Sequence, residues 1–142
     1  MSAIVEISHS LEFSAAHRLH NPNFTDAENL ALYGPCNTLH GHNYGVEVTV
    51  RGPLSKETGM VMDLNVLMKL MQSEIFEPVD HKNLGTDVPF LEGVISTAEN
   101  LSVVFWDRLL PHIKGGEGCR LHRVRVTESR SNRVDYYGPA AS

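Results

Sequence analysis

The chain has 142 residues, of which 42% are hydrophobic and 20% are charged, and its formal net charge is −5. This length and composition predict one globular domain over residues 1–142. The acidic balance argues against a nucleic-acid-binding protein, which needs a basic surface. Because we find neither a membrane-spanning apolar run nor a secretory signal, we expect a cytoplasmic protein that binds no membrane.

The first predicted element is a strand over residues 3–16, where apolar and polar residues alternate, and we expect it to contain a bulge. His17 closes this extended segment, and His20 follows as a competing candidate for the same role. Residues 21–35 have the composition of a loop. A loop of this length in a compact domain is usually functional, so we expect it to form a lid or wall of a site.

The next stretch carries the strongest chemical signal. Cys36 stands four residues before the pair His40 and His42, and a strand is predicted over residues 43–53. If that strand begins near His40, its two-residue period places both imidazoles on one face, where they can share a metal ion. With His17 as third ligand, one tetrahedral position stays open, as in catalytic zinc sites. Two alternatives are a pair of surface histidines and a structural site in which Cys36 is the fourth ligand.

Two amphipathic helices follow. The first is predicted over residues 64–76, and Pro78 is expected to end it. The second is capped by Ser96 or Thr97, and Glu99 is placed to complete a capping box with Ser96. Both helices have one apolar stripe, so we expect them to pack on the same face of a sheet.

Between the helices, Asp80 and His81 stand side by side in an irregular segment. A carboxylate beside an imidazole can orient the ring and raise its basicity. A bare Asp-His dipeptide is more often structural than functional, so it indicates a functional site only if other residues point to one as well.

The C-terminal part predicts a hairpin. Residues 119–128 alternate, with Leu121 on the face of two arginines and Glu128 on the opposite face with two valines. A four-residue loop over 129–132 then leads into a strand over 133–137. The element order predicts an α+β fold: a four-stranded antiparallel sheet with two helices on one face and an open, arginine-bearing face.

Several segments together resemble the 6-pyruvoyltetrahydropterin synthase and 6-carboxytetrahydropterin synthase family, over about residues 4–138. They are residues 13–19, 36–44, 80–84, 96–100 and 127–128. The resemblance implies the tunnelling fold, in which three subunits join their sheets into a barrel and two trimers stack into a homohexamer. It also implies active sites at subunit interfaces, so that some site residues meet across chains.

The resemblance also implies roles for single residues and a substrate, 7,8-dihydroneopterin triphosphate. The implied residues are zinc (Zn²⁺) ligands (His17, His40, His42), a general base with charge-relay partners (Cys36, Asp80, His81) and pterin-binding residues (Glu128, Ser96, Thr97). Side chains of these types can perform the chemistry that this substrate requires. Vicinal hydroxyls of the substrate side chain can bind zinc, a thiolate of lowered pKa can take a proton from carbon, and a carboxylate can accept hydrogen bonds from the pterin ring.

The family has two products, and the signals for them conflict. One branch makes 6-pyruvoyltetrahydropterin, on the way to biopterin; the other makes 6-carboxytetrahydropterin and acetaldehyde, on the way to queuosine and other deazapurines. The short gap between Cys36 and His40 is typical of the carboxy branch, whereas segments 59–64, 80–84 and 88–90 look more like the pyruvoyl branch. We favour the carboxy product, because the gap touches the catalytic thiol.

Two further functions remain open. One is a non-enzymatic metal- or pterin-binding module, which would unfold when its metal is chelated. The other is a tunnelling-fold protein with aldolase or hydrolase chemistry, which would turn over unphosphorylated dihydroneopterin.

Overall fold

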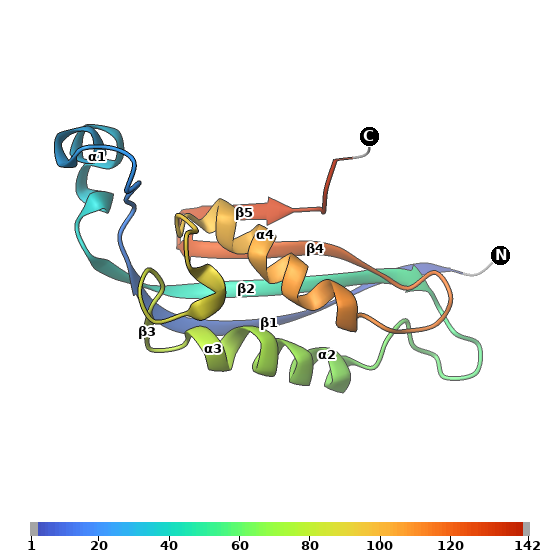
Figure 1. The fold of residues 1–142 in the computed structure, drawn as a ribbon. Helices are drawn as coiled ribbons and strands as arrows, with labels where there is room; N and C mark the ends of the chain where they lie inside the picture. Colours follow the sequence, from blue (N-terminus) through green and yellow to red (C-terminus); the bar gives the residue numbers. More distant parts are fainter. Residues whose placement is uncertain (1–2, 141–142) are drawn as a thin grey trace.

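A computed structural model describes residues 3–140, which form one mixed sheet with helices on one face (Figure 1). The strands lie in the order β3-β1-β2-β4-β5. Their bounds are Ile4–His17 (β1), His40–Pro53 (β2), Lys82–Asn83 (β3), Arg120–Ser129 (β4) and Asn132–Tyr136 (β5). The predicted antiparallel strands are all present, and the α+β class is confirmed. The sheet nevertheless has a fifth strand, because β3 pairs parallel with the end of β1.

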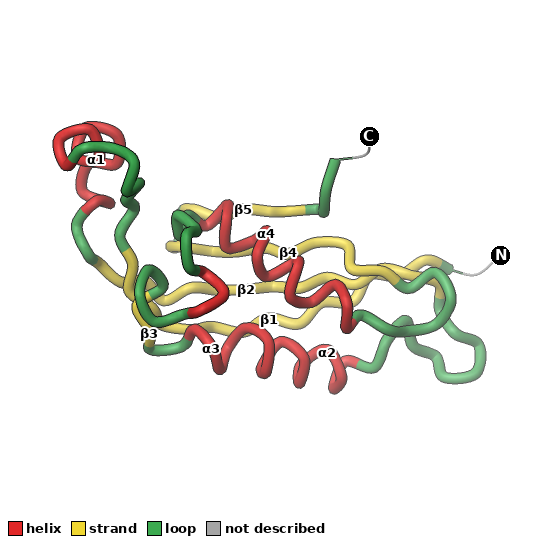
Figure 2. The backbone as a smooth tube through the Cα atoms, in the orientation of Figure 1, coloured by secondary structure: helices red, strands yellow, loops and turns green. Residues whose placement is uncertain are grey.

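The helices that follow β2 cover the face of the sheet that carries the core, whereas the first helix lies beyond the end of the sheet; Figure 2 shows the helices in red against the yellow strands. Their bounds are Asp26–Tyr33 (α1), Leu64–Met71 (α2), Glu77–Val79 (α3) and Ala98–Leu109 (α4). Alternate residues of β2 from Tyr44 to Val50 are buried and belong to the same core as Phe105 of α4. Within residues 3–140, no helix combines the length and apolarity that a membrane span requires.

The prediction that residues 21–35 form a loop is wrong in part, because this segment contains α1. Thr25 caps this helix and forms a capping box with Glu28, a local signal that loop composition conceals. The helix projects from the end of the sheet (Figure 1), and Leu30 and Leu32 on it are exposed.

The first long helix does not end at residue 76. It passes through a wide turn, Gln72–Phe76, and continues as α3 to Val79. Pro78 lies in the first turn of α3, where its missing N–H is tolerated. In a regular α-helix Pro78 would face the carbonyl of Glu74; that carbonyl instead accepts a bond from Arg108 Nε at 2.8 Å. A tertiary contact therefore replaces the hydrogen bond that proline cannot make.

The predicted bulge lies elsewhere. The register of β1 with β2 is unbroken from Ile4 to His17, so β1 has no bulge. The irregularity is in β4, where Thr49 and Val50 of β2 face Arg123 and Leu121, leaving one residue of β4 between them unpaired. Leu121 consequently turns into the core, and its predicted place beside the arginines is wrong.

Two local expectations at turns are also corrected. Ser129 pairs with Asn132, so the hairpin loop has two residues rather than the predicted four. Thr97 is the N-cap of α4 and accepts from the N–H of Asn100, so the expected box between Ser96 and Glu99 does not cap the helix.

Candidate metal centre

Three histidines meet at the end of β1 and the start of β2. His17 and His40 face each other in the register, and His42 follows on the same face of β2. The ring centroids are 4.6 Å apart for His17 and His40, 5.2 Å for His17 and His42, and 4.9 Å for His40 and His42. One ligand atom from each histidine lies within 4.8 Å of the other two. The predicted grouping of these three residues is therefore present, and the competing His20 is outside it.

The hydrogen bonds of the cluster fit a metal. His17 Nδ1 lies 2.8 Å from the Ser96 carbonyl, and His40 Nδ1 lies 2.6 Å from the Thr38 carbonyl. Each Nδ1–H can donate to its carbonyl, which leaves the Nε2 lone pair free to ligate. Nε2 of His17 and of His42 are both buried and have no hydrogen-bond partner among the described residues.

Burial also favours the form of His17 that can bind a metal. Desolvation lowers the pKa of His17, against a smaller opposing effect of its bond to Ser96. A neutral imidazole is the ligating form. Metal binding would therefore satisfy the buried nitrogens that the fold leaves without partners.

Cys36 lies apart from this cluster. It belongs to a short 3₁₀ turn, Gly34–Asn37, at the base of the segment that projects beyond β1 and β2. Its carbonyl accepts the N–H of Leu19 at 2.8 Å, and Asn37 Nδ2 donates to the Leu19 carbonyl at 2.9 Å. Among the described residues the metal-binding group consists of histidines alone, which disfavours a structural site with Cys36 as fourth ligand.

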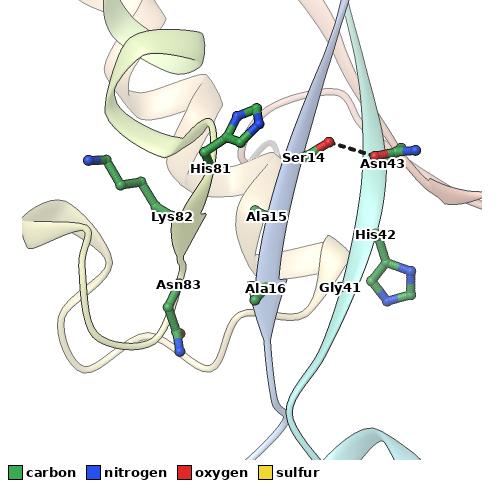
Figure 3. Close-up of a pocket in the computed structure, with 9 residues that line it drawn as sticks. All are labelled: Ser14, Ala15, Ala16, Gly41, His42, Asn43, His81, Lys82 and Asn83. Carbon is green, nitrogen blue, oxygen red and sulfur yellow. Dashed lines mark hydrogen bonds between the residues drawn. The ribbon is translucent and has the colours of Figure 1, made fainter.

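Asp80 and His81 form a pair beside β1. Asp80 accepts the N–H of Ser14 at 3.0 Å and lies 2.7 Å from His81 Nδ1, and the bond from Ser14 is the main cause of the lowered pKa of Asp80. His81 has a positive φ of 59° and a largely exposed side chain. In Figure 3 it lies beside β1, whereas His42 projects from the far side of β2. The two strands thus separate the pair from the histidine cluster within one chain.

A cavity of about 510 Å³ adjoins the Asp80–His81 pair (Figure 3). Its walls include Ser14 and Asn43, whose side chains are hydrogen-bonded at 2.6 Å, together with His81 and Lys82. Ser14 and Asn43 point to the open face of the sheet, but the lining also includes the metal ligand His42, so this cavity extends from the Asp80–His81 pair to the strand that carries the cluster.

Glu128 lies next to the metal cluster. Its Oε1 is 3.8 Å from His42 Nε2, and it lines a cavity of about 270 Å³ together with Thr97 and Glu99. Ser96 is buried, and its backbone carbonyl holds His17. The structure therefore brings Glu128 and Thr97 together near the metal ligands and places Ser96 behind one of them.

Sequence reasoning missed Tyr44 and Thr38. Tyr44 is fully buried under the cluster, and its hydroxyl has no hydrogen-bond partner among the described residues. Its place two residues after His42 on one strand face was a usable signal. Thr38 acts through its carbonyl, which no side-chain pattern reveals.

A three-histidine cluster with one buried and two half-buried members, beside a cavity lined by carboxylates at the end of the sheet, defines a candidate metal-dependent enzyme of the α+β class. A family model described as "6-pyruvoyl tetrahydropterin synthase" matches residues 6–139, and the chain belongs to this family.

Relatives extend over nearly the whole chain. The human protein named 6-pyruvoyl tetrahydrobiopterin synthase is 46% identical over 135 residues, 94% of this chain and 91% of its own length. The Drosophila melanogaster protein of the same name is 45% identical over 129 residues, 89% of this chain and 76% of its own length. The solved structure of Caenorhabditis elegans 6-pyruvoyl tetrahydropterin synthase has a TM-score of 0.89 at 38% identity, covering 97% of this chain and 98% of that one. The predicted family and fold are thereby confirmed.

Proposed function

We propose that this chain is a zinc-dependent 6-pyruvoyltetrahydropterin synthase acting on 7,8-dihydroneopterin triphosphate. The observation that carries the proposal is the cluster of His17, His40 and His42, with two buried and unpartnered Nε2 atoms, in a member of this family. Relatives at 45% and 46% identity bear the pyruvoyl name. The comparisons thus favour this product over the carboxy product that the Cys36–His40 gap favours.

In this proposal the three histidines hold zinc, which supplies Lewis-acid polarisation of the substrate side chain when bound. Glu128 accepts hydrogen bonds from the pterin ring, because its carboxylate lines the cavity beside His42. Thr97 and Ser96 form the wall next to it, Thr97 in that cavity and Ser96 through its bond to His17. Fixing the ring in this way orients the side chain for reaction.

Cys36 is the proposed general base, and Asp80 and His81 are its proposed relay. The short bond between Asp80 and His81 supports the pairing of those two residues. Since β1 and β2 separate them from His42 within one chain, we infer that the pair serves the thiol of a neighbouring subunit.

The sheet edge supports assembly with further copies. From Ile4 to Ser14, the outer edge of β1 pairs with no described strand, since β3 reaches only Ala15 and Ala16. A long free edge is a template for pairing with another chain. We infer a homohexamer built as a dimer of trimers, with β1 and β5 as the edges that join.

The second candidate is the 6-carboxytetrahydropterin synthase reaction. It rests on the gap of three residues between Cys36 and His40. A relative from Archaeoglobus fulgidus, named a putative 6-carboxy-5,6,7,8-tetrahydropterin synthase, is 32% identical over 106 residues, 75% of this chain and 82% of its own length.

Product analysis decides between the candidates. Zinc-loaded protein and a Cys36→Ala variant are incubated with 7,8-dihydroneopterin triphosphate, and products are identified by mass spectrometry. A pyruvoyl product without acetaldehyde supports the proposal, and acetaldehyde with a 6-carboxy product supports the second candidate. Absence of both products would refute both synthase proposals and favour a metal- or pterin-binding module. Turnover of unphosphorylated dihydroneopterin would favour aldolase or hydrolase chemistry.

A further inference from the structure

A further cavity, separate from the one that Glu128 lines, is lined by residues that stand next to metal ligands in the chain. It measures about 400 Å³, and its polar walls are Arg18, His20, Asn83, Thr86 and Ser96. Consecutive residues line the two cavities: Arg18 and Ser96 line this one, whereas Leu19 and Thr97 line the other. The hydrogen bond between His17 and Ser96 joins the two segments that the cavities share. Each cavity is therefore lined by a residue close to a metal ligand, Ser96 at His17 in one and Glu128 near His42 in the other.

The two cavities differ in charge. The lining of the Glu128 cavity includes two carboxylates, those of Glu99 and Glu128, and one cation, Arg133. The lining of the Arg18 cavity includes no carboxylate, although the chain has 17 acidic and only 12 basic residues. Asp87 adjoins Thr86, but its oxygens accept from the Thr86 hydroxyl and from the N–H of Asn83.

The guanidinium of Arg18 is available to a ligand. It forms no side-chain hydrogen bond or ion pair with another residue in the range 3–140, whereas Arg51, Arg108, Arg123 and Arg125 each pair with a carboxylate. Three other arginines, Arg120, Arg130 and Arg133, are also without such a partner in that range, but none of them lines this cavity. A free guanidinium binds phosphate oxygens through two parallel N–H donors. His20 and the amide of Asn83 add further polar groups in the same wall.

We propose that the Arg18 cavity binds the triphosphate group of the substrate; this rests on the proposed function and extends it. The carbon that carries the triphosphate is bonded directly to one of the two hydroxyl-bearing carbons of the side chain. The phosphates must therefore lie beside the metal ligands. Arg18 follows His17 in the chain, and Leu39, which precedes His40, also lines this cavity. The pterin ring, rich in N–H donors, takes the cavity with two carboxylates, and the polyanion takes the cavity that has an arginine and no carboxylate.

Inorganic triphosphate is the direct probe of this site. Its binding to the zinc-loaded protein is measured by isothermal titration calorimetry for the unmodified chain, Arg18→Gln, Arg18→Lys and the control Arg120→Gln. Arg120 lies at the far end of β4, so the control removes the same charge away from the cavity. Zinc content is measured after each titration to identify removal of the metal by the probe, and thermal melting verifies that each variant is folded.

We expect Arg18→Gln to weaken binding by about tenfold or more, the loss that one charged hydrogen-bonding group causes. Arg18→Lys should retain part of the affinity, and Arg120→Gln all of it. Equal affinities of Arg18→Gln and the unmodified chain, or no binding to the unmodified chain, would overturn the proposal.

The outcome separates this inference from the proposed function. Triphosphate binding that depends on Arg18, without turnover in either product assay, would leave the anion site standing and remove the synthase reaction. Turnover of the substrate with a KM unchanged in Arg18→Gln would remove the anion site alone.

Discussion

Arg108 should contribute more to stability than an ordinary surface arginine, because it replaces a hydrogen bond that Pro78 cannot make. Its Nε donates to the Glu74 carbonyl at 2.8 Å, its Nη2 to the Glu74 carboxylate at 2.8 Å, and its guanidinium lies 4.0 Å from the Phe90 ring centroid. These contacts join the turn at the end of α2 to α4 and so hold the segment that leads to Asp80.

The magnitude follows from the separate contacts of Arg108. A charged donor to a carbonyl contributes about 1.5–3 kcal/mol. The partly exposed ion pair contributes about 0.5–1 kcal/mol, and the contact with Phe90 about 0.5–1 kcal/mol. Because one side chain makes all three contacts, their values do not add fully, and we expect Arg108→Met to lower the free energy of unfolding by about 3 kcal/mol.

Urea denaturation of a double-mutant cycle isolates the role of Pro78. Pro78→Ala restores an N–H that can bond to the Glu74 carbonyl, so Arg108→Met should cost about 1 kcal/mol less in that background. Arg108→Lys is the matched control, since it keeps the charge but lacks the Nε donor. Equal costs of Arg108→Met in both backgrounds would refute the idea that arginine replaces the missing bond.

Three further predictions concern the site and the open face. His42→Ala should abolish stoichiometric zinc binding, whereas His20→Ala should retain it, as metal analysis of purified protein would show; zinc retained by His42→Ala contradicts the assigned ligands. Glu128→Gln should raise the KM for the pterin substrate at least tenfold while zinc content stays constant, and an unchanged KM counts against Glu128 as the ring anchor. The hydrogen bond from Arg125 lowers the pKa of Asp135 in the folded state. The pair therefore stabilises the fold fully at pH values above the ordinary pKa of aspartate, and this stabilisation is lost as the pH falls through the lower pKa of Asp135 in the folded protein. Urea midpoints in the acid range should therefore depend less on pH for Asp135→Asn, and an unchanged pH dependence contradicts that assignment.

The metal ligands were predictable because local geometry decides most of their arrangement. The two-residue period of a strand places His40 and His42 on one face wherever the strand begins, provided that it includes both. His17 required only that its extended segment lie beside theirs. The register that sets His17 against His40 follows from fourteen consecutive pairs between β1 and β2, which no short motif specifies.

Other features depend on contacts between distant segments and were therefore hidden. The carbonyls of Ser96 and Thr38 orient two ligands, yet backbone oxygens carry no sequence signature. Where the helix continues through Pro78, a side chain from α4 donates to the Glu74 carbonyl, and that contact joins segments far apart in the sequence. The bulge that turns Leu121 inward depends on its pairing with β2, not on alternation within β4.

The position of Cys36 bears directly on the choice of product. Its carbonyl is bonded to the N–H of Leu19, and the neighbouring Asn37 bonds back to the Leu19 carbonyl, so the thiol-bearing turn is attached to the end of β1. Residues 38–39 connect this turn to His40, whose Nδ1 is bonded to the Thr38 carbonyl. Added residues in that connection could bulge outward while the bonds to Leu19 keep the turn in place. The length of the Cys36–His40 gap therefore constrains the thiol less than sequence spacing suggests, which reduces its weight as an indicator of the carboxy product. Similarity over the whole chain, which includes the residues around the bond to Leu19, is the better guide, and it favours the pyruvoyl product.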